Sequence, residues 1–367
     1  MNKIHVLVID DSAFMRKLIS DFLREDPRIG TIETARNGIE GLEKIKKNKP
    51  DVITLDVEMP VKNGIEILKQ IMQNDPIPVI MLSSTTKEGA DHTLLAMQLG
   101  AFDFIPKPSG SISLDLYKIK QELISKVILA SQTSKNRLTK MAQMKTFTIK
   151  DKDSYSKINL EKRSNQMVAL KREVCHLYTG QIICIGTSTG GPRALQTVLT
   201  KLPKNIPASI LVVQHMPAGF TKSLAERLNS ICEIEVKEAE DREPLRNGVA
   251  YIAPGGYHLK IKKHQFKHCI KLDESPPRNN HRPSVDVLFE SAAIATDLKK
   301  IAVIMTGMGN DGSKGLIELK NKGKLIAIAE SKETANVYGM PKAAVETKLV
   351  DEVQDVENIA KTILKFV

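Results

Sequence analysis

The chain has 367 residues, which is too long for one ordinary core and therefore predicts two domains. The 41% hydrophobic and 26% charged residues are typical of a globular protein, and the sequence has neither a membrane-length apolar run nor a signal-peptide pattern. The four cysteines lack metal-ligand spacing. Together these features predict a cytoplasmic protein with reduced thiols. The net charge of +11 would suit nucleic acid, but 4% aromatic residues and no tryptophan argue against a base-stacking surface.

Apolar strands alternate with helices through the first hundred residues. The predicted strands cover residues 3–9, 31–35, 51–56, 77–84 and 101–108, and the predicted helices cover 12–26, 38–48, 65–73 and 91–99. This alternation predicts a doubly wound parallel sheet, in which a ligand site lies at the carboxyl ends of the strands.

Five polar residues follow these strands: Asp10, Asp11, Asp56, Ser83 and Lys107. Clustered carboxylates suit Mg²⁺, which also accepts phosphate oxygens, and a lysine opposite them can neutralise a phosphoryl group. Helix caps and solvated charges are the alternative explanation. Because these polar groups end four of the five predicted strands, we favour one shared site.

These five polar residues carry a resemblance: residues 1–125 resemble a response-regulator receiver domain. The resemblance implies that Asp56 accepts a phosphoryl group and that Asp10, Asp11, Asp56 and the backbone carbonyl of Glu58 hold Mg²⁺. It also implies a hydroxyl and aromatic switch pair and a lysine that contacts the phosphoryl group: Ser83, Phe104 and Lys107.

The alternating pattern fades after residue 125. Residues 126–178 are rich in Lys, Ser, Thr, Asn and Gln and have few clustered apolar residues, which predicts a flexible basic linker. An interaction tether is the competing interpretation, because basic tracts bind acidic surfaces.

From residue 179 to 367 the sequence again alternates strand and helix. The stretch QIICIGTSTGG runs from a strand at Ile182 into a glycine turn, and Pro192 follows where a helix would begin. This geometry can expose the Ser188 hydroxyl beside backbone N–H groups that hold an anion. A plain βα turn or a phosphate cradle would use the same glycines.

Two later strands also end in residues that suit nucleophilic catalysis. His215 lies at the carboxyl end of the predicted strand ASILVVQHM, and Asp311 lies just beyond the strand KIAVIMTG. An imidazole can remove the proton of a serine, and a carboxylate can orient the imidazole and stabilise its charge. Taken singly, His215 could be a capped strand-end histidine and Asp311 an Asx turn. Together with Ser188 they favour a serine hydrolase.

Four motifs carry a second resemblance: IGTSTGG, VVQHMPAGFT, RPSVDVLF and TGMGNDG. Residues 179–367 resemble the catalytic domain of the CheB family of chemotaxis receptor methylesterases. The resemblance implies Ser188 as nucleophile, His215 as general base and acid, and Asp311 as the residue that orients His215. It places the oxyanion and substrate loops at Thr189 and Met308.

The resemblance also implies the activity and the partners. The expected reaction is hydrolysis of glutamate methyl esters on the cytoplasmic helices of chemoreceptors, with deamidation of selected glutamines. The expected phosphodonor is the chemotaxis histidine kinase. Mg²⁺ would serve the receiver, and ester hydrolysis would need no cofactor. No nucleic acid and no membrane insertion are expected.

Two other function classes compete. A receiver, a linker and a basic output domain would also suit a transcription factor, but the output has no helix-turn-helix pattern. The segment GTSTGGP could be a nucleotide phosphate loop, but it lacks the Gly-Lys-Ser/Thr ending of a Walker loop.

Overall fold

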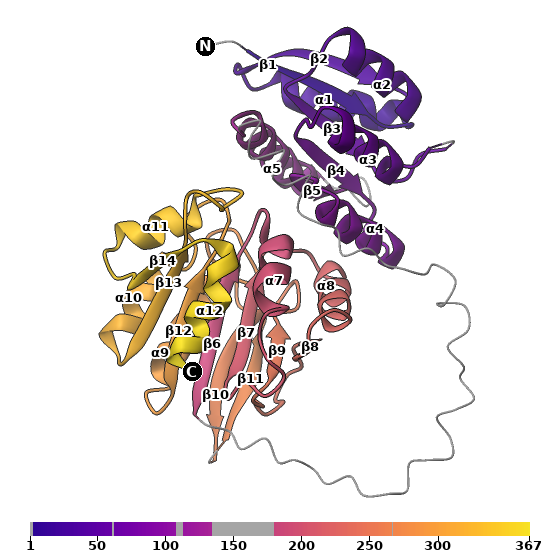
Figure 1. Cartoon of the computed structure of the whole chain (residues 1–367). Coiled ribbons are helices and arrows are strands. Elements are labelled where there is room, and N and C mark those ends of the chain that lie inside the picture. The colour runs from indigo at the N-terminus through magenta and orange to yellow at the C-terminus, as the bar shows by residue number, and fades with distance from the viewer. Residues whose placement is uncertain (1–2, 61, 108–112, 134–179, 266) are drawn as a thin grey trace, which may run out of the picture.

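The computed structural model describes residues 3–60, 62–107, 113–133, 180–265 and 267–367, which form two α/β units (Figure 1). Both units are built on parallel sheets, so the predicted fold class is confirmed. No helix in the described ranges combines the length and the apolar character needed to cross a bilayer.

The N-terminal unit is a five-stranded sheet in the order β2-β1-β3-β4-β5. Buried apolar residues lie on both faces, where α1 and α5 cover one side and α2, α3 and α4 cover the other. The elements are β1 (Ile4–Ile9), α1 (Ala13–Arg24), β2 (Ile29–Ala35), α2 (Gly38–Lys47), β3 (Val52–Asp56), α3 (Gly64–Asn74), β4 (Val79–Ser83), α4 (Lys87–Gln98), β5 (Asp103–Pro106) and α5 (Ser113–Ser131).

Helix α5 runs past the boundary that the sequence predicts at residue 125. Val127 and Ala130 are fully buried in the N-terminal core, since they cover the same sheet face as Leu123. The first residues of the predicted linker are therefore part of the folded unit. The rest of the linker prediction, residues 134–178, lies outside the described residues.

The C-terminal unit is a seven-stranded parallel sheet in the order β14-β13-β12-β6-β7-β9-β8, with an antiparallel hairpin of β10 and β11. Helices α7, α8 and α12 pack on one face, and α9 and α10 pack on the other. The elements are β6 (Gln181–Thr187), α7 (Gly191–Leu199), β7 (Ser209–Gln214), α8 (Phe220–Asn229), β8 (Glu235–Glu238), β9 (Val249–Ile252), β10 (His258–His264), β11 (Lys267–Asp273), α9 (Val285–Ile294), β12 (Lys299–Ile304), α10 (Ser313–Asn321), β13 (Leu325–Glu330), α11 (Met340–Glu346), β14 (Glu352–Gln354) and α12 (Val356–Phe366).

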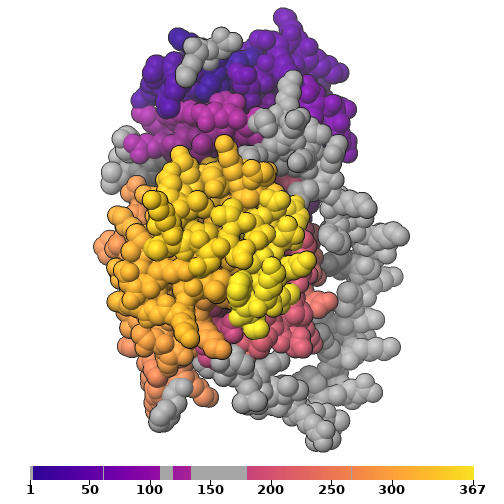
Figure 2. Space-filling view, turned by 60° about the vertical axis from the view of Figure 1, so that its left-hand side comes forward, coloured from indigo at the N-terminus to yellow at the C-terminus, as the bar shows by residue number. Residues whose placement is uncertain are grey.

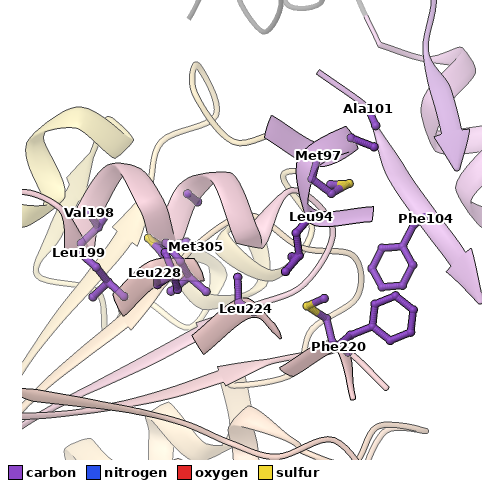
Figure 3. Close-up of a cluster of buried hydrophobic side chains, with 14 of the residues drawn as sticks. Leu94, Met97, Ala101, Phe104, Val198, Leu199, Phe220, Leu224, Leu228 and Met305 are labelled. Atoms are coloured by element: carbon purple, nitrogen blue, oxygen red, sulfur yellow. The ribbon is translucent and has the colours of Figure 1, made fainter. Parts of the chain in front are cut away.

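The two units pack against each other over an apolar contact. Helix α4 lies on α7 and α8, and one buried cluster runs continuously from the first sheet into the second. Figure 3 shows Leu94 and Met97 of α4 next to Leu224 of α8. The rings of Phe104 and Phe220 stack across the contact, with centroids 4.9 Å apart and planes at 22°.

The space-filling view shows the N-terminal unit seated directly on the C-terminal one (Figure 2). Because burial of apolar surface stabilises association, this contact favours the docked arrangement of the two units.

Candidate active site and phosphoacceptor site

Ser188 and His215 lie side by side because their strands are paired in register. Thr187, the last residue of β6, pairs with Gln214, the last residue of β7. The N–H of His215 donates to the Thr187 carbonyl at 3.1 Å, and the N–H of Ser188 donates to the Thr306 carbonyl at 3.0 Å. The ends of β7, β6 and β12 therefore meet at one rim, as the sequence analysis expected.

His215 and Asp311 form the polar centre of this rim. Nε2 of His215 lies 2.8 Å from Oδ2 of Asp311, and both side chains are almost fully buried. Asp311 also accepts from the N–H groups of Val285 and Asp286 and from the Ser284 hydroxyl. Burial raises the pKa of Asp311, but the His215 contact and the two N–H donors outweigh it and hold that pKa far below its ordinary value. Asp311 is thus an ionised carboxylate that accepts a hydrogen bond from Nε2 of His215.

With Nε2 committed to Asp311, the free lone pair of neutral His215 is on Nδ1. Nδ1 is buried and has no hydrogen-bond partner in the described part of the chain. Ser188 is partly exposed at the adjacent strand end. The N–H groups of Thr189 and Met308 likewise donate to no acceptor among the described residues, so both are available to an oxyanion.

Gly307 holds the loop after β12 against Ser188, the predicted nucleophile. A Cβ on Gly307 would lie 2.8 Å from the Ser188 Cβ and 2.4 Å from the Met340 sulfur. We expect Gly307→Ala to displace Ser188 and to lower the rate of ester hydrolysis about 100-fold, because a shift of about 1 Å at a reacting group lowers a rate by about that factor. Steady-state hydrolysis of a methyl ester substrate, the reaction expected from the sequence, measures this. Gly30→Ala, on β2 of the N-terminal unit, places its new Cβ nearest to the Lys3 side chain; it is the control and should leave turnover unchanged. Wild-type turnover in Gly307→Ala would contradict this packing.

A second polar site lies at the carboxyl edge of the N-terminal sheet. Carboxylate oxygens of Asp10, Asp11 and Asp56 all lie within 4.8 Å of one another. Nζ of Lys107 is 2.7 Å from Asp56 and 3.2 Å from Asp10. Burial raises the pKa of Asp56 to about 6, against the effect of Lys107. Three hard oxygen donors with room for one small ion fit Mg²⁺, and Glu58 follows in the same loop, with its N–H donating to Asp56 at 3.1 Å.

The two predicted switch residues connect this site with the domain contact. The Ser83 hydroxyl is buried at the end of β4 and donates to the Gly89 carbonyl at 2.9 Å. Phe104 is buried on β5, where its ring stacks on Phe220 and its carbonyl accepts from Lys126 at 2.7 Å. The aromatic residue is therefore held inward, against the other unit.

The same surface also reaches the loop that carries Ser188. The Thr189 hydroxyl donates to Asp103 at 2.6 Å, and the Asn336 amide donates to the Phe102 carbonyl at 3.2 Å. The Met308 side chain packs against a buried cluster that joins Val337 to the apolar residues of the N-terminal sheet. Of the two residues expected at the oxyanion, Thr189 thus contacts the N-terminal unit directly, and Met308 lies on the cluster that both units share.

Two residues that contact the His215–Asp311 pair were not predicted from the sequence. His281 ends no strand, yet its ring stacks on that of His215 with ring centroids 3.9 Å apart. The Asn279 amide donates to Asp311 at 3.0 Å and to Asp286 at 2.9 Å. The only available signal was their position just before the RPSVDVLF motif.

Comparisons with known proteins match both units of the chain to known domain families. A family model described as CheB methylesterase matches residues 183–363, and one described as response regulator receiver domain matches residues 6–116. The protein-glutamate methylesterase/protein-glutamine glutaminase of Halalkalibacterium halodurans is 54% identical over 99% of this chain and 98% of its own length. This chain belongs to the CheB methylesterase family.

Other relatives span the chain equally. The proteins of the same name from Geobacillus kaustophilus and Bacillus subtilis are 53% and 50% identical, over 100% and 99% of this chain and 99% and 98% of their own lengths. The crystal structure of the Thermotoga maritima CheB methylesterase catalytic domain matches with a TM-score of 0.50 and 49% identity, and covers 52% of this chain and 100% of that chain. The receiver and the methylesterase domain of the family are therefore both present.

Proposed function

We propose that this protein is a phosphorylation-activated serine hydrolase that removes methyl groups from glutamate methyl esters on chemoreceptor cytoplasmic helices and deamidates selected glutamines there. The observation that carries the proposal is the buried His215–Asp311 pair beside Ser188, at a rim that the receiver contacts through Thr189. Its place of action is the cytoplasm, where those helices lie. Its partners are the methyl-accepting receptors and the chemotaxis histidine kinase.

The chain's own residues supply each step of the hydrolysis. Nδ1 of His215 takes the hydroxyl proton of Ser188 while Oγ of Ser188 attacks the ester carbonyl. The resulting oxyanion forms opposite the N–H groups of Thr189 and Met308. The protonated His215 gives that proton to the leaving methoxide, which departs as methanol and leaves an acyl-enzyme. Water, deprotonated by His215, then releases glutamate and restores Ser188. A glutamine follows the same steps and releases ammonia.

Control of the site passes through the receiver. Asp56 accepts the phosphoryl group, and Lys107 contacts the phosphoryl oxygens. Asp10, Asp11, Asp56 and the Glu58 carbonyl would hold Mg²⁺, which would neutralise part of the phosphoryl charge. A phosphoryl group on Asp56 draws the hydroxyl of Ser83 away from Gly89. Phe104 then leaves the position in which it stacks on Phe220, which weakens the contact between the two units.

Polar contacts of Gln98 contribute to the docked form. Its side chain donates to Gln196 at 3.0 Å and accepts from Arg227 at 3.2 Å. A net hydrogen bond contributes about 1 kcal/mol, so we expect Gln98→Ala to raise the activity of the unphosphorylated protein about fivefold. Methanol release without a phosphodonor measures this. Gln73→Ala, at an exposed position of α3, should change nothing. An equal rise in Gln73→Ala, or no rise in Gln98→Ala, would contradict the role of the contact.

Mass spectrometry of receptor peptides tests the proposed reaction. Receptor membranes are methylated, incubated with the full-length protein, Mg²⁺ and a small-molecule phosphodonor, and then digested. Conversion of methyl-glutamate to glutamate, and of selected glutamines to glutamate, is the expected result. Unchanged peptides in the presence of folded, phosphorylated protein would contradict the proposal.

A further inference from the structure

A tight turn at residues 278–281 reaches into the active site from outside the sheet. The backbones of Arg278 and His281 are joined by two hydrogen bonds, of 3.0 and 2.9 Å. The two central residues, Asn279 and Asn280, both have positive φ, of 52° and 65°, as in the two-residue turns of hairpins. Asparagine tolerates this conformation better than most residues, so the turn is a defined and rigid support.

The rest of the protein anchors this turn. The Arg278 guanidinium donates to Glu290 on α9 at 2.9 Å, and the carbonyl of Arg282 accepts from the Gly256 N–H at 3.0 Å. The Ser284 hydroxyl, which follows the turn, donates to Asp311. Because both ends are tied, the side chains of the turn keep fixed positions relative to the strand ends.

Asn279 connects two buried carboxylates. Its amide donates to Oδ1 of Asp311 at 3.0 Å and to Oδ2 of Asp286 at 2.9 Å. The other oxygen of Asp286 accepts from the N–H groups of Gly312 and Gly315. Asn279 therefore fixes the rotation of the Asp311 carboxylate, which leaves Oδ2 directed at His215.

His281 fixes the other partner of that contact. Its ring lies over the His215 ring, with centroids 3.9 Å apart and planes at 11°. Charged and titratable groups face it from three elements: His215 after β7, Asp311 after β12 and Lys126 on α5. Burial and the positive charge of His215 lower the pKa of His281 to about 3, so it stays neutral while His215 carries a proton during the reaction.

We propose that Asn279 and His281 are positioning residues for the hydrolysis, and that the turn at residues 278–281 holds His215 and Asp311 in the orientation in which Nδ1 faces the nucleophile. His281 limits rotation of the His215 ring, and Asn279 limits rotation of the Asp311 carboxylate. Both residues act through the side chains that they contact, Asp311 and His215. The inference concerns the reactivity of Ser188 and rests on the proposed function only for the choice of natural substrate.

The first test measures Ser188 reactivity without a receptor. An alkyl fluorophosphonate reacts with an activated serine: an Oγ–P bond forms, fluoride leaves, and His215 takes the hydroxyl proton. Intact-mass spectrometry of the full-length protein, with Mg²⁺ and a phosphodonor, gives the rate constant. We expect Asn279→Ala and His281→Ala each to lower it about tenfold. Wild-type rate constants in both variants would overturn the proposal.

Two matched variants separate positioning from stability. Asn280→Ala makes the same change at the neighbouring left-handed position, where no side-chain hydrogen bond to the triad exists in the described residues, and should keep the rate constant within twofold. His281→Phe keeps a neutral ring over His215 and should restore the rate lost in His281→Ala. Equal losses in Asn279→Ala and Asn280→Ala, or no rescue by phenylalanine, would overturn the proposal.

Receptor hydrolysis adds a second readout. A positioning role predicts that Asn279→Ala and His281→Ala lower kcat about tenfold with little change in KM. A rise in KM at unchanged kcat would overturn it. If the wild-type protein reacts with the fluorophosphonate but leaves receptor esters intact, the proposed substrate fails while the positioning inference stands.

Discussion

Ser188→Ala is expected to lower methyl ester hydrolysis by at least about 10⁴-fold, since the nucleophile of a serine triad carries most of its rate enhancement. The variant keeps the backbone contacts of the turn, because the Ser188 N–H and carbonyl make them: the N–H donates to Thr306, and the carbonyl accepts from Gly191 and Gln214. Methanol release by the phosphorylated protein is the measurement, with circular dichroism to confirm folding.

The control for this variant is Ser230→Ala, which removes an exposed hydroxyl at the end of α8. It should hydrolyse receptor esters at the wild-type rate. If Ser188→Ala remains folded and retains more than about a tenth of the wild-type rate, another group is the nucleophile and the mechanism above is wrong.

Asp311→Asn is expected to lower kcat by about 10³- to 10⁴-fold, the range seen when the orienting carboxylate of a triad becomes an amide. Asp311 accepts from five donors, two on the backbone and three on the side chains of Asn279, Ser284 and His215. An asparagine adds an NH₂ donor to this set. When that NH₂ faces His215, Nε2 becomes the acceptor and the proton moves to Nδ1, the atom that must act as base.

A pre-steady-state assay tests this tautomer argument. The acylation step of Asp311→Asn should be slow at every pH from 6 to 9, because the amide has no charge to recover. Asp355→Asn, the same change at the N-cap of α12, should acylate at the wild-type rate. Near wild-type acylation in Asp311→Asn would contradict the role of the carboxylate.

The sequence was sufficient for the sheets because their strands are nearly continuous apolar runs. β6, β7 and β12 are buried on both faces and end at Thr187, Gln214 and Ile304, so the strand-end rule brought Ser188, His215 and Asp311 together. Helix α4 was predicted from residue 91 but begins at Lys87. The first turn of α4 is polar and lacks the helical spacing of apolar residues by which the start was predicted. Its start is marked instead by the Thr86 hydroxyl, which caps the helix by accepting from the Gly89 N–H.

Other features depend on tertiary contacts that no local pattern encodes. β8 is a short polar edge strand, Glu235–Glu238, which pairs only with β9. His281 reaches His215 from a turn, and Asp103 reaches Thr189 from the other unit across a contact between residues 86 positions apart. The sequence pattern predicts which residues lie at strand ends. The contacts of His281 and Asp103 depend instead on the conformation of a loop and on the packing of the two units against each other.

The central claim is that a serine esterase at Ser188 is controlled by phosphorylation of Asp56. Its most direct test is methanol release from methyl-labelled receptor membranes, with and without a small-molecule phosphodonor and Mg²⁺, by the wild type and by Asp56→Ala. The donor should raise release by the wild type and leave release by Asp56→Ala at the basal rate. Equal stimulation of both proteins, or no release by the folded wild type, would contradict it.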